Sequence, residues 1–104
     1  MEIQDNTANW PTYTSCTGTA LTCTVPISVL KASPFNLAGG STVKVKVKAV
    51  NVIGTSVPST EGGSAMLPHV PGAPGAPTTS ISGTNVVIVW TAPSSDGGST
   101  ITEY

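Results

Sequence analysis

The 104-residue sequence contains no arginine, and only 9% of its residues are charged, with a formal net charge of −1. A surface that binds nucleic acid needs clustered basic side chains to neutralise phosphates. We therefore expect no nucleic-acid partner. The sequence also has no apolar run approaching the roughly 20 residues that a membrane-spanning helix needs, so we expect no membrane span.

Groups that support catalysis or metal binding are equally sparse. His69 is the only histidine and has no nucleophile or acid pair beside it, and the five acidic residues are scattered singly. Two cysteines alone cannot close a structural zinc site, which takes four ligands. We therefore expect no enzyme, no metal and no cofactor.

Small and β-branched residues are abundant instead: the chain has 16 Thr, 12 Ser, 11 Gly and 9 Pro. This mixture favours short strands and turns over helices, and the length fits one small domain. Residues 2–8 indicate a short, polar edge strand. Residues 26–30 resemble a single helical turn or a strand exit.

The two cysteines, Cys16 and Cys23, have six residues between them with a central glycine, Gly18. Alternating residues around a glycine suit a hairpin that brings two sulfurs together, and we predict a disulfide. Two free thiols in a cytosolic domain are the alternative. A disulfide places the protein outside the reducing cytosol, in an extracellular or cell-surface location.

Residues 43–49 alternate apolar and basic side chains without a break. This period of two predicts a half-buried strand with its valines inward. The inward residues are Val43, Val45 and Val47. The outward residues are Lys44, Lys46 and Lys48. The lysines are a candidate site for an anionic glycan or an acidic neighbour, and the alternative is a solvated face that protects the sheet from aggregation.

Pro68, Pro71, Pro74 and Pro77 recur every three residues, which is the polyproline II period. Glycine obeys the collagen period at only two positions, which cannot make a triple helix. Residues 68–77 therefore indicate a semi-rigid extended linker.

Residues 80–90 are the clearest strand in the sequence. Val86, Ile88 and Trp90 share one face, and Val87 and Val89 share the other. Two apolar residues on the second face indicate a lateral contact or cover by a glycan. A turn follows at residues 92–99, and residues 100–104 begin another strand.

Residues 76–104 resemble the first third of a fibronectin type III domain. The matching features are Ile81 in strand A, Val86-Val87-Ile88-Val89-Trp90 in strand B, the loop with Ala92-Pro93 and Asp96-Gly97-Gly98, and Ile101-Thr102-Glu103-Tyr104 in strand C. Residues 41–59 resemble strand F and the following turn of the same family, with Ala49-Val50-Asn51, Gly54-Thr55-Ser56 and Pro58-Ser59. Val43 stands where the family usually has a tyrosine. The cysteine hairpin with Pro34-Phe35-Asn36-Leu37 resembles repeats in large surface proteins of protists.

The resemblance covers the chain in a circularly shifted order. Residues 1–67 resemble strands C′, E, F and G, residues 68–77 are the linker, and residues 78–104 resemble strands A, B and C. Read in a circle, Tyr104 continues into Glu2. The resemblance implies an all-β fibronectin type III or immunoglobulin-like sandwich, completed by strands exchanged between neighbouring chains or repeats.

The expected function is structural. The linker reaches about 30 Å at 3.1 Å per residue, against a sandwich of roughly 30–40 Å, so exchange between chains is favoured over closure within one chain. Head-to-tail exchange builds a filament. The alternatives are one repeat of a tandem-array surface protein that acts as an adhesion or binding module, and a monomeric circular permutant.

Particular residues are expected at the contacts between subunits or repeats. The strand interface is formed by Val86, Ile88, Trp90, Ile101, Tyr104, Val43, Val45 and Val47. The candidate O-glycosylation sites are Thr12, Thr14, Thr17, Thr78 and Thr79. No Asn-x-Ser/Thr acceptor for N-glycans is present.

Overall fold

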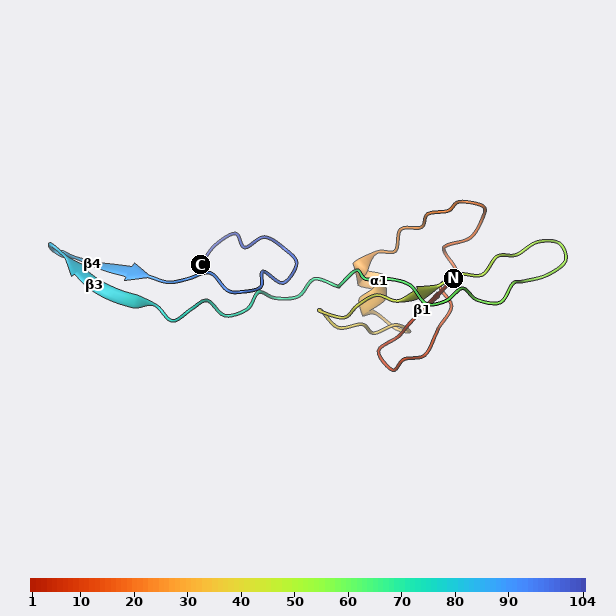
Figure 1. Ribbon diagram of the computed structural model, residues 1–104, viewed down its shortest axis with the longest axis horizontal. Helices are drawn as coiled ribbons and strands as arrows, with labels where there is room; N and C mark the ends of the chain where they lie inside the picture. Colours follow the sequence, from red (N-terminus) through yellow and green to blue (C-terminus); the bar gives the residue numbers. More distant parts are fainter. The chain divides into compact units, whose positions relative to one another are not determined.

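The structure is a computed structural model that describes residues 1–104. The chain divides into two compact units, Met1–Leu67 and Pro68–Tyr104. In Figure 1 the first unit runs from red to green and the second from teal to blue.

Regular secondary structure is short in both units. The first unit contains β1 (Glu2–Ile3), α1 (Ile27–Lys31) and β2 (Val45–Lys46), and the second contains β3 (Thr78–Ser82) and β4 (Asn85–Val89). The strands form two small antiparallel sheets, β1–β2 and β3–β4. The expectation of a mainly β chain with little helix is confirmed, whereas the expected sandwich is not seen.

Residues 1–4 lie between two neighbouring segments of the first unit. On one side Glu2 pairs with Lys46, and on the other side Glu2 forms a bridge with Thr12. The Ile3 N–H donates to the carbonyl of Pro11 at 3.1 Å. The expected edge strand is therefore wrong in its position, because Ile3 is fully buried and anchors a central strand.

A long irregular hairpin covers the other edge of β2. The Val43 N–H donates to Ala65 O at 2.8 Å, and Val45 and Gly62 exchange both backbone bonds. Beyond that pair, the Val47 N–H donates to the Ser59 hydroxyl at 3.1 Å instead of to a carbonyl. Serine hydroxyls compete with the backbone ladder in this way, so the strand predicted over residues 43–49 is regular only at Val45–Lys46.

The core of the first unit is apolar. Its buried residues are Ile3, Leu30, Phe35, Leu37 and Leu67. The helical turn α1, which begins after Pro26, supplies Leu30, and the Leu37 N–H donates to Leu30 O at 2.9 Å. The Tyr13 ring meets Phe35 edge to face, with centroids 6.2 Å apart. The helical turn is confirmed, and it covers the sheet.

The second unit is one long hairpin. Residues Thr78 and Ser82 pair with Val89 and Asn85, and a two-residue turn at 83–84 joins the strands. Gly83 has φ +59°, the positive value that a type II′ turn needs at its first position.

The Pro/Gly-rich segment continues one arm of this hairpin. The N–H groups of His69, Gly72 and Gly75 donate to the carbonyls of Gly97, Ser95 and Thr91 at 2.9–3.0 Å. These donors recur every three residues, the interval at which an extended proline-rich chain turns the same side to a neighbour. The segment that we expected to be a linker is therefore bonded along residues 91–97.

Candidate functional site

The β3–β4 hairpin presents an uncovered apolar face. Its register puts Ile81 opposite Val86, so these side chains share a face with Ile88 and Trp90. The exposed fractions are 82% for Ile81, 63% for Val86, 55% for Ile88 and 45% for Trp90. Four neighbouring large apolar residues with this exposure form an open apolar patch and not a protected core. We call these four residues the donor face.

The opposite face of β4 carries the two residues predicted for a lateral contact. Val87 and Val89 are 41% and 57% exposed, and they lie opposite Ser80 and Thr78. The hairpin is thus apolar on one face and mixed on the other. The lateral contact stays a prediction.

The two aromatic residues predicted at the interface lie together. The Trp90 and Tyr104 rings meet edge to face, with centroids 5.9 Å apart and planes at 62°. Ile101 is half-buried, but residues 101–104 form no strand. The aromatic pair is therefore present, whereas the strand that we expected at residues 100–104 is absent.

The predicted row of inward valines is only partly covered. Val43 and Val45 pack against the core of the first unit. Val47 is 54% exposed. The apolar face of this sheet therefore extends beyond the residues that α1 and its neighbours cover.

Each lysine of the predicted anionic contact has a partner within the first unit. Lys44 Nζ lies 3.0 Å from Glu61 Oε1, and Lys48 Nζ lies 2.6 Å from Glu2 Oε1. Lys46 Nζ lies 3.8 Å from the centre of the Trp10 ring, in a cation–π contact. Because these partners stand elsewhere in the chain, the pattern of residues 43–49 gave no sign of them.

Two carboxylates of the first unit have shifted affinities for protons. The hydrogen bond from Lys48 lowers the pKa of Glu2 below its ordinary value, against a smaller effect of desolvation. Desolvation raises the pKa of Asp5, but the N–H groups of Thr7 and Asn9, each 2.8 Å from Asp5 Oδ1, outweigh it and lower the pKa. Both groups therefore stabilise local structure as carboxylates.

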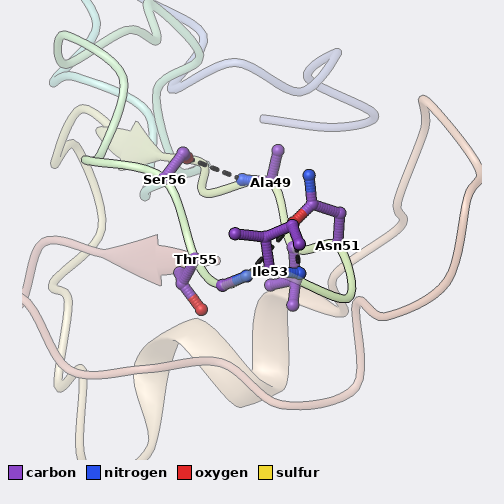
Figure 2. A pocket seen from close by; sticks show the side chains of 7 residues that line it. Ala49, Asn51, Ile53, Thr55 and Ser56 are labelled. Carbon is purple, nitrogen blue, oxygen red and sulfur yellow. Dashed lines mark hydrogen bonds between the residues drawn. The ribbon is translucent and has the colours of Figure 1, made fainter.

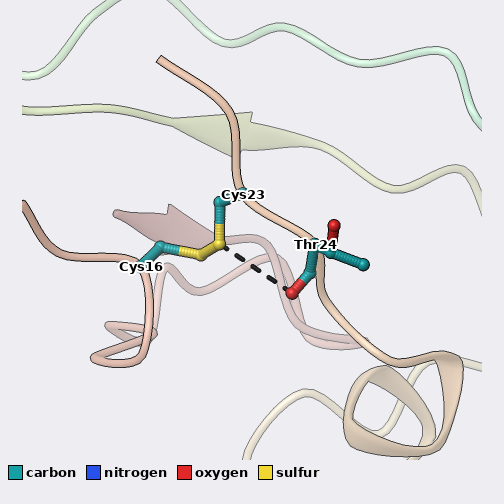
Figure 3. Close-up of a disulfide and its surroundings, with 3 residues drawn as sticks. All are labelled: Cys16, Cys23 and Thr24. Atoms are coloured by element: carbon teal, nitrogen blue, oxygen red, sulfur yellow. Dashed lines mark hydrogen bonds between the residues drawn. A yellow bond between two sulfur atoms is a disulfide. The ribbon is translucent and has the colours of Figure 1, made fainter. Parts of the chain in front are cut away.

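The disulfide between Cys16 and Cys23 is present, with a Cα–Cα distance of 5.7 Å (Figure 3). The Cys23 sulfur lies 3.9 Å from the Thr24 carbonyl oxygen. No backbone ladder joins the two arms of the loop, so the expected hairpin is held by the sulfurs alone. Leu21 is fully exposed at its tip.

Hollows in the first unit flank the open part of its sheet. A hollow of 810 Å³ lies between the disulfide loop and residues 47–50, and Met1 also lines it. A neighbouring hollow of 460 Å³, which shares Ala49, Val50 and Thr55 with the first, lies at the turn of residues 49–56 (Figure 2). There Asn51 Oδ1 accepts hydrogen bonds from the Ile53 and Gly54 N–H groups, so this side-chain oxygen is used in the turn itself.

The candidate O-glycosylation threonines are all exposed. The structure shows no cluster of three or more His, Cys, Asp or Glu side chains. It also has no helix with the length and apolarity that crossing a membrane requires. Comparison with family models, with curated proteins and with solved structures finds no match.

Proposed function

We propose that the protein is a non-catalytic extracellular structural subunit that assembles head to tail, and that its second unit completes a β-sandwich with the first unit of a neighbouring copy. The observation that carries the proposal is the exposure of the donor face on β3–β4. A two-stranded hairpin alone is marginally stable in water. Burial of Val86, Ile88 and Trp90 contributes roughly 2 kcal/mol each, which favours association.

The first unit offers a matching surface. Its sheet continues past the covered core to Val47, which is half exposed, and beyond it to the large hollow. An apolar donor face and an apolar acceptor on different parts of one chain produce a heterologous contact. Such a contact repeats without closing, so it builds a filament.

A neighbouring copy is the partner in this proposal, because the donor face and the acceptor surface belong to different parts of the chain and a head-to-tail contact between them can repeat from copy to copy. The disulfide supports an extracellular location, because such bonds persist in oxidising compartments.

The direct test is the mass of the full chain in dilute solution, combined with electron microscopy. We expect species much larger than the 10.4 kDa chain, and fibres. Deletion of residues 77–104 and the substitution Trp90→Ala should each abolish them. A uniform 10.4 kDa species without fibres, or normal assembly of Trp90→Ala, contradicts the proposal.

A second candidate function is an adhesion module within a tandem array. The loop at residues 94–99 favours it, because bonds from Gly72 to Ser95 and from His69 to Gly97 hold the loop in place. Ser94, Ser95 and Asp96 are exposed on it. Replacement of these three residues by alanine should abolish ligand binding in an adhesion module and leave a filament intact.

A further inference from the structure

The large hollow of the first unit continues the line of β1. Its walls are the disulfide loop, with Cys16 and Leu21, and residues 47–50, and Met1 closes one end. A second hollow of 360 Å³ shares these walls and adds Ser15. We call the space between residues 15–21 and 47–50 the acceptor groove.

The register of the sheet explains why the groove has the width of one β-strand. Glu2 pairs with Lys46 on one side and with Thr12 on the other. The Tyr13 N–H donates to Met1 O at 2.8 Å. The two flanking segments are thus already held apart by one strand at β1, at about 4.8 Å per neighbour. Beyond Met1 they enclose the acceptor groove.

One wall of the groove has unpaired backbone groups. In an antiparallel strand, alternate residues direct their N–H and C=O groups to opposite neighbours. Val45 and Ala49 bond to the hairpin side, and Lys44 bonds to Gln4 on the β1 side. Lys48 and Val50 therefore turn their backbone groups to the groove, where neither has a backbone hydrogen bond.

The other wall has the same property. The carbonyl of Pro11 and the N–H of Tyr13 bond to residues of the β1 segment. The alternation then turns Ser15 toward the groove, and Ser15 has no backbone hydrogen bond. A groove with free donors and acceptors on both walls fits an extended peptide, which satisfies them on both of its edges.

The second unit contains an extended segment with matching properties. Residues 101–104 make no backbone hydrogen bonds. Thr102 and Tyr104 share one face, and Ile101 and Glu103 share the other. Four residues of strand span roughly 13 Å at 3.3 Å each.

Charge complementarity orients this segment. Of the three lysines on the outer face, Lys48 lines the groove; its ammonium has three donors, of which the ion pair with Glu2 uses one, and Glu103 makes no ion pair. With Glu103 on the lysine face, Tyr104 lies on the apolar face beside Val47. Strand pairing and charge are thus satisfied in one orientation.

We propose that the acceptor groove binds residues 101–104 of a second copy of this chain as a β-strand between residues 15–17 and 47–50. This inference rests on the proposed function, since it names where the second unit of one copy enters the first unit of the next. A second copy supplies the strand in the head-to-tail assembly proposed above, and the mass measurement described below distinguishes it from insertion within one chain.

Hydrogen exchange of the full chain, with the mass measured in the same samples, tests the proposal. Slow exchange at the Ser15, Lys48 and Val50 amides in the assembled protein supports it. Assembly with fast exchange at these amides overturns the strand site and leaves the proposed function standing. Slow exchange in a 10.4 kDa species overturns the second copy as partner, and fast exchange in a 10.4 kDa species overturns both proposals.

A mixing experiment separates the two surfaces. Ala49→Glu places a charge in the acceptor groove, and Thr102→Pro removes a strand N–H from the inserted segment. Each variant alone should need at least about tenfold more protein to assemble. Mixed together, they should form a 1:1 complex of two 10.4 kDa chains, because one retains the groove and the other the segment.

The matched control is Val52→Glu, which adds the same charge at a fully exposed residue outside the groove. We expect this variant to assemble like the wild type. Normal assembly of Ala49→Glu overturns the groove as the acceptor. Failure of the mixed variants to form a complex, while wild type assembles, overturns the pairing of this segment with the groove.

Discussion

The two units of the chain differ in what holds them together. The first buries five large apolar side chains around Phe35, whereas the second buries no apolar side chain. The second unit is ordered by backbone pairing along one hairpin, from His69–Gly97 to Ser82–Asn85. Backbone hydrogen bonds contribute little net stability in water, so the first unit has an apolar core to stabilise it, whereas the second has none of its own.

The largest expected effect is the loss of the core of the first unit. Phe35→Ala should lower its free energy of unfolding by about 3–5 kcal/mol, measured by chemical denaturation. Ile88→Ala is the matched change in the second unit. Because Ile88 is 55% exposed, this variant should leave the unfolding of the unassembled chain nearly unchanged. A large effect of Ile88→Ala in a 10.4 kDa species would mean that the chain covers its own donor face.

Removal of the disulfide should have the next largest effect. The double variant Cys16→Ser, Cys23→Ser should destabilise the first unit by about 2 kcal/mol, since the closed loop is short. A dithiol should produce the same loss in the wild type and none in the variant. Exchange of the β3–β4 amides should not change, because the second unit contains no cysteine. Equal loss in both units would contradict their independence.

A turn substitution tests the hairpin of the second unit. Gly83 has φ +59°, and a β-branched residue is strained there by about 1 kcal/mol or more. Gly83→Val should therefore speed exchange of the β3–β4 amides and leave the first unit unaffected. Thr84→Val is the control, because Thr84 has no positive φ. Similar exchange in the two variants would contradict this turn.

The smallest expected effect concerns acid. The pKa of Glu2 is lower in the folded chain than in the unfolded chain. The ionised Glu2 therefore contributes its full stabilisation to the first unit above the unfolded pKa of this carboxyl, and this stabilisation is lost as the pH falls through the lower, folded pKa. Stability of the first unit should decline on acidification below about pH 4.3. Glu2→Gln should make this decline shallower, as measured by denaturation at several pH values. Glu103→Gln, which removes a carboxylate without an ion pair, should leave the decline unchanged.

Local patterns predicted several features. The spacing of Cys16 and Cys23 predicted their disulfide, and the residues after Val25 indicated a helical turn or a strand exit, of which the helical turn α1 is present. The strand predicted over residues 80–90 is only partly correct: β4 covers Asn85–Val89, whereas residues 80–82 belong to β3 and a turn separates the two strands. These features depend on neighbours in sequence, so period and spacing carry the information.

Other features could not be read from local patterns. The central position of residues 1–4 depends on pairing with residues 44–46, some forty positions away. The serine hydroxyls that replace carbonyls at Val47 and Ala49 shorten a strand whose own alternation is unbroken. Strand pairs and their register are set by contacts distant in sequence, which no local period records.

By itself, the sequence determined that this chain is built of short β segments, that two cysteines pair, and that Val86, Ile88 and Trp90 share one face of residues 85–90. The tertiary structure decided which apolar residues are covered. Ile3, Leu37 and Leu67 are buried by one another, while the longer apolar run of β4 stays open to solvent. The physical reason is that burial requires a second surface, and hydrophobic pattern alone does not say where that surface lies.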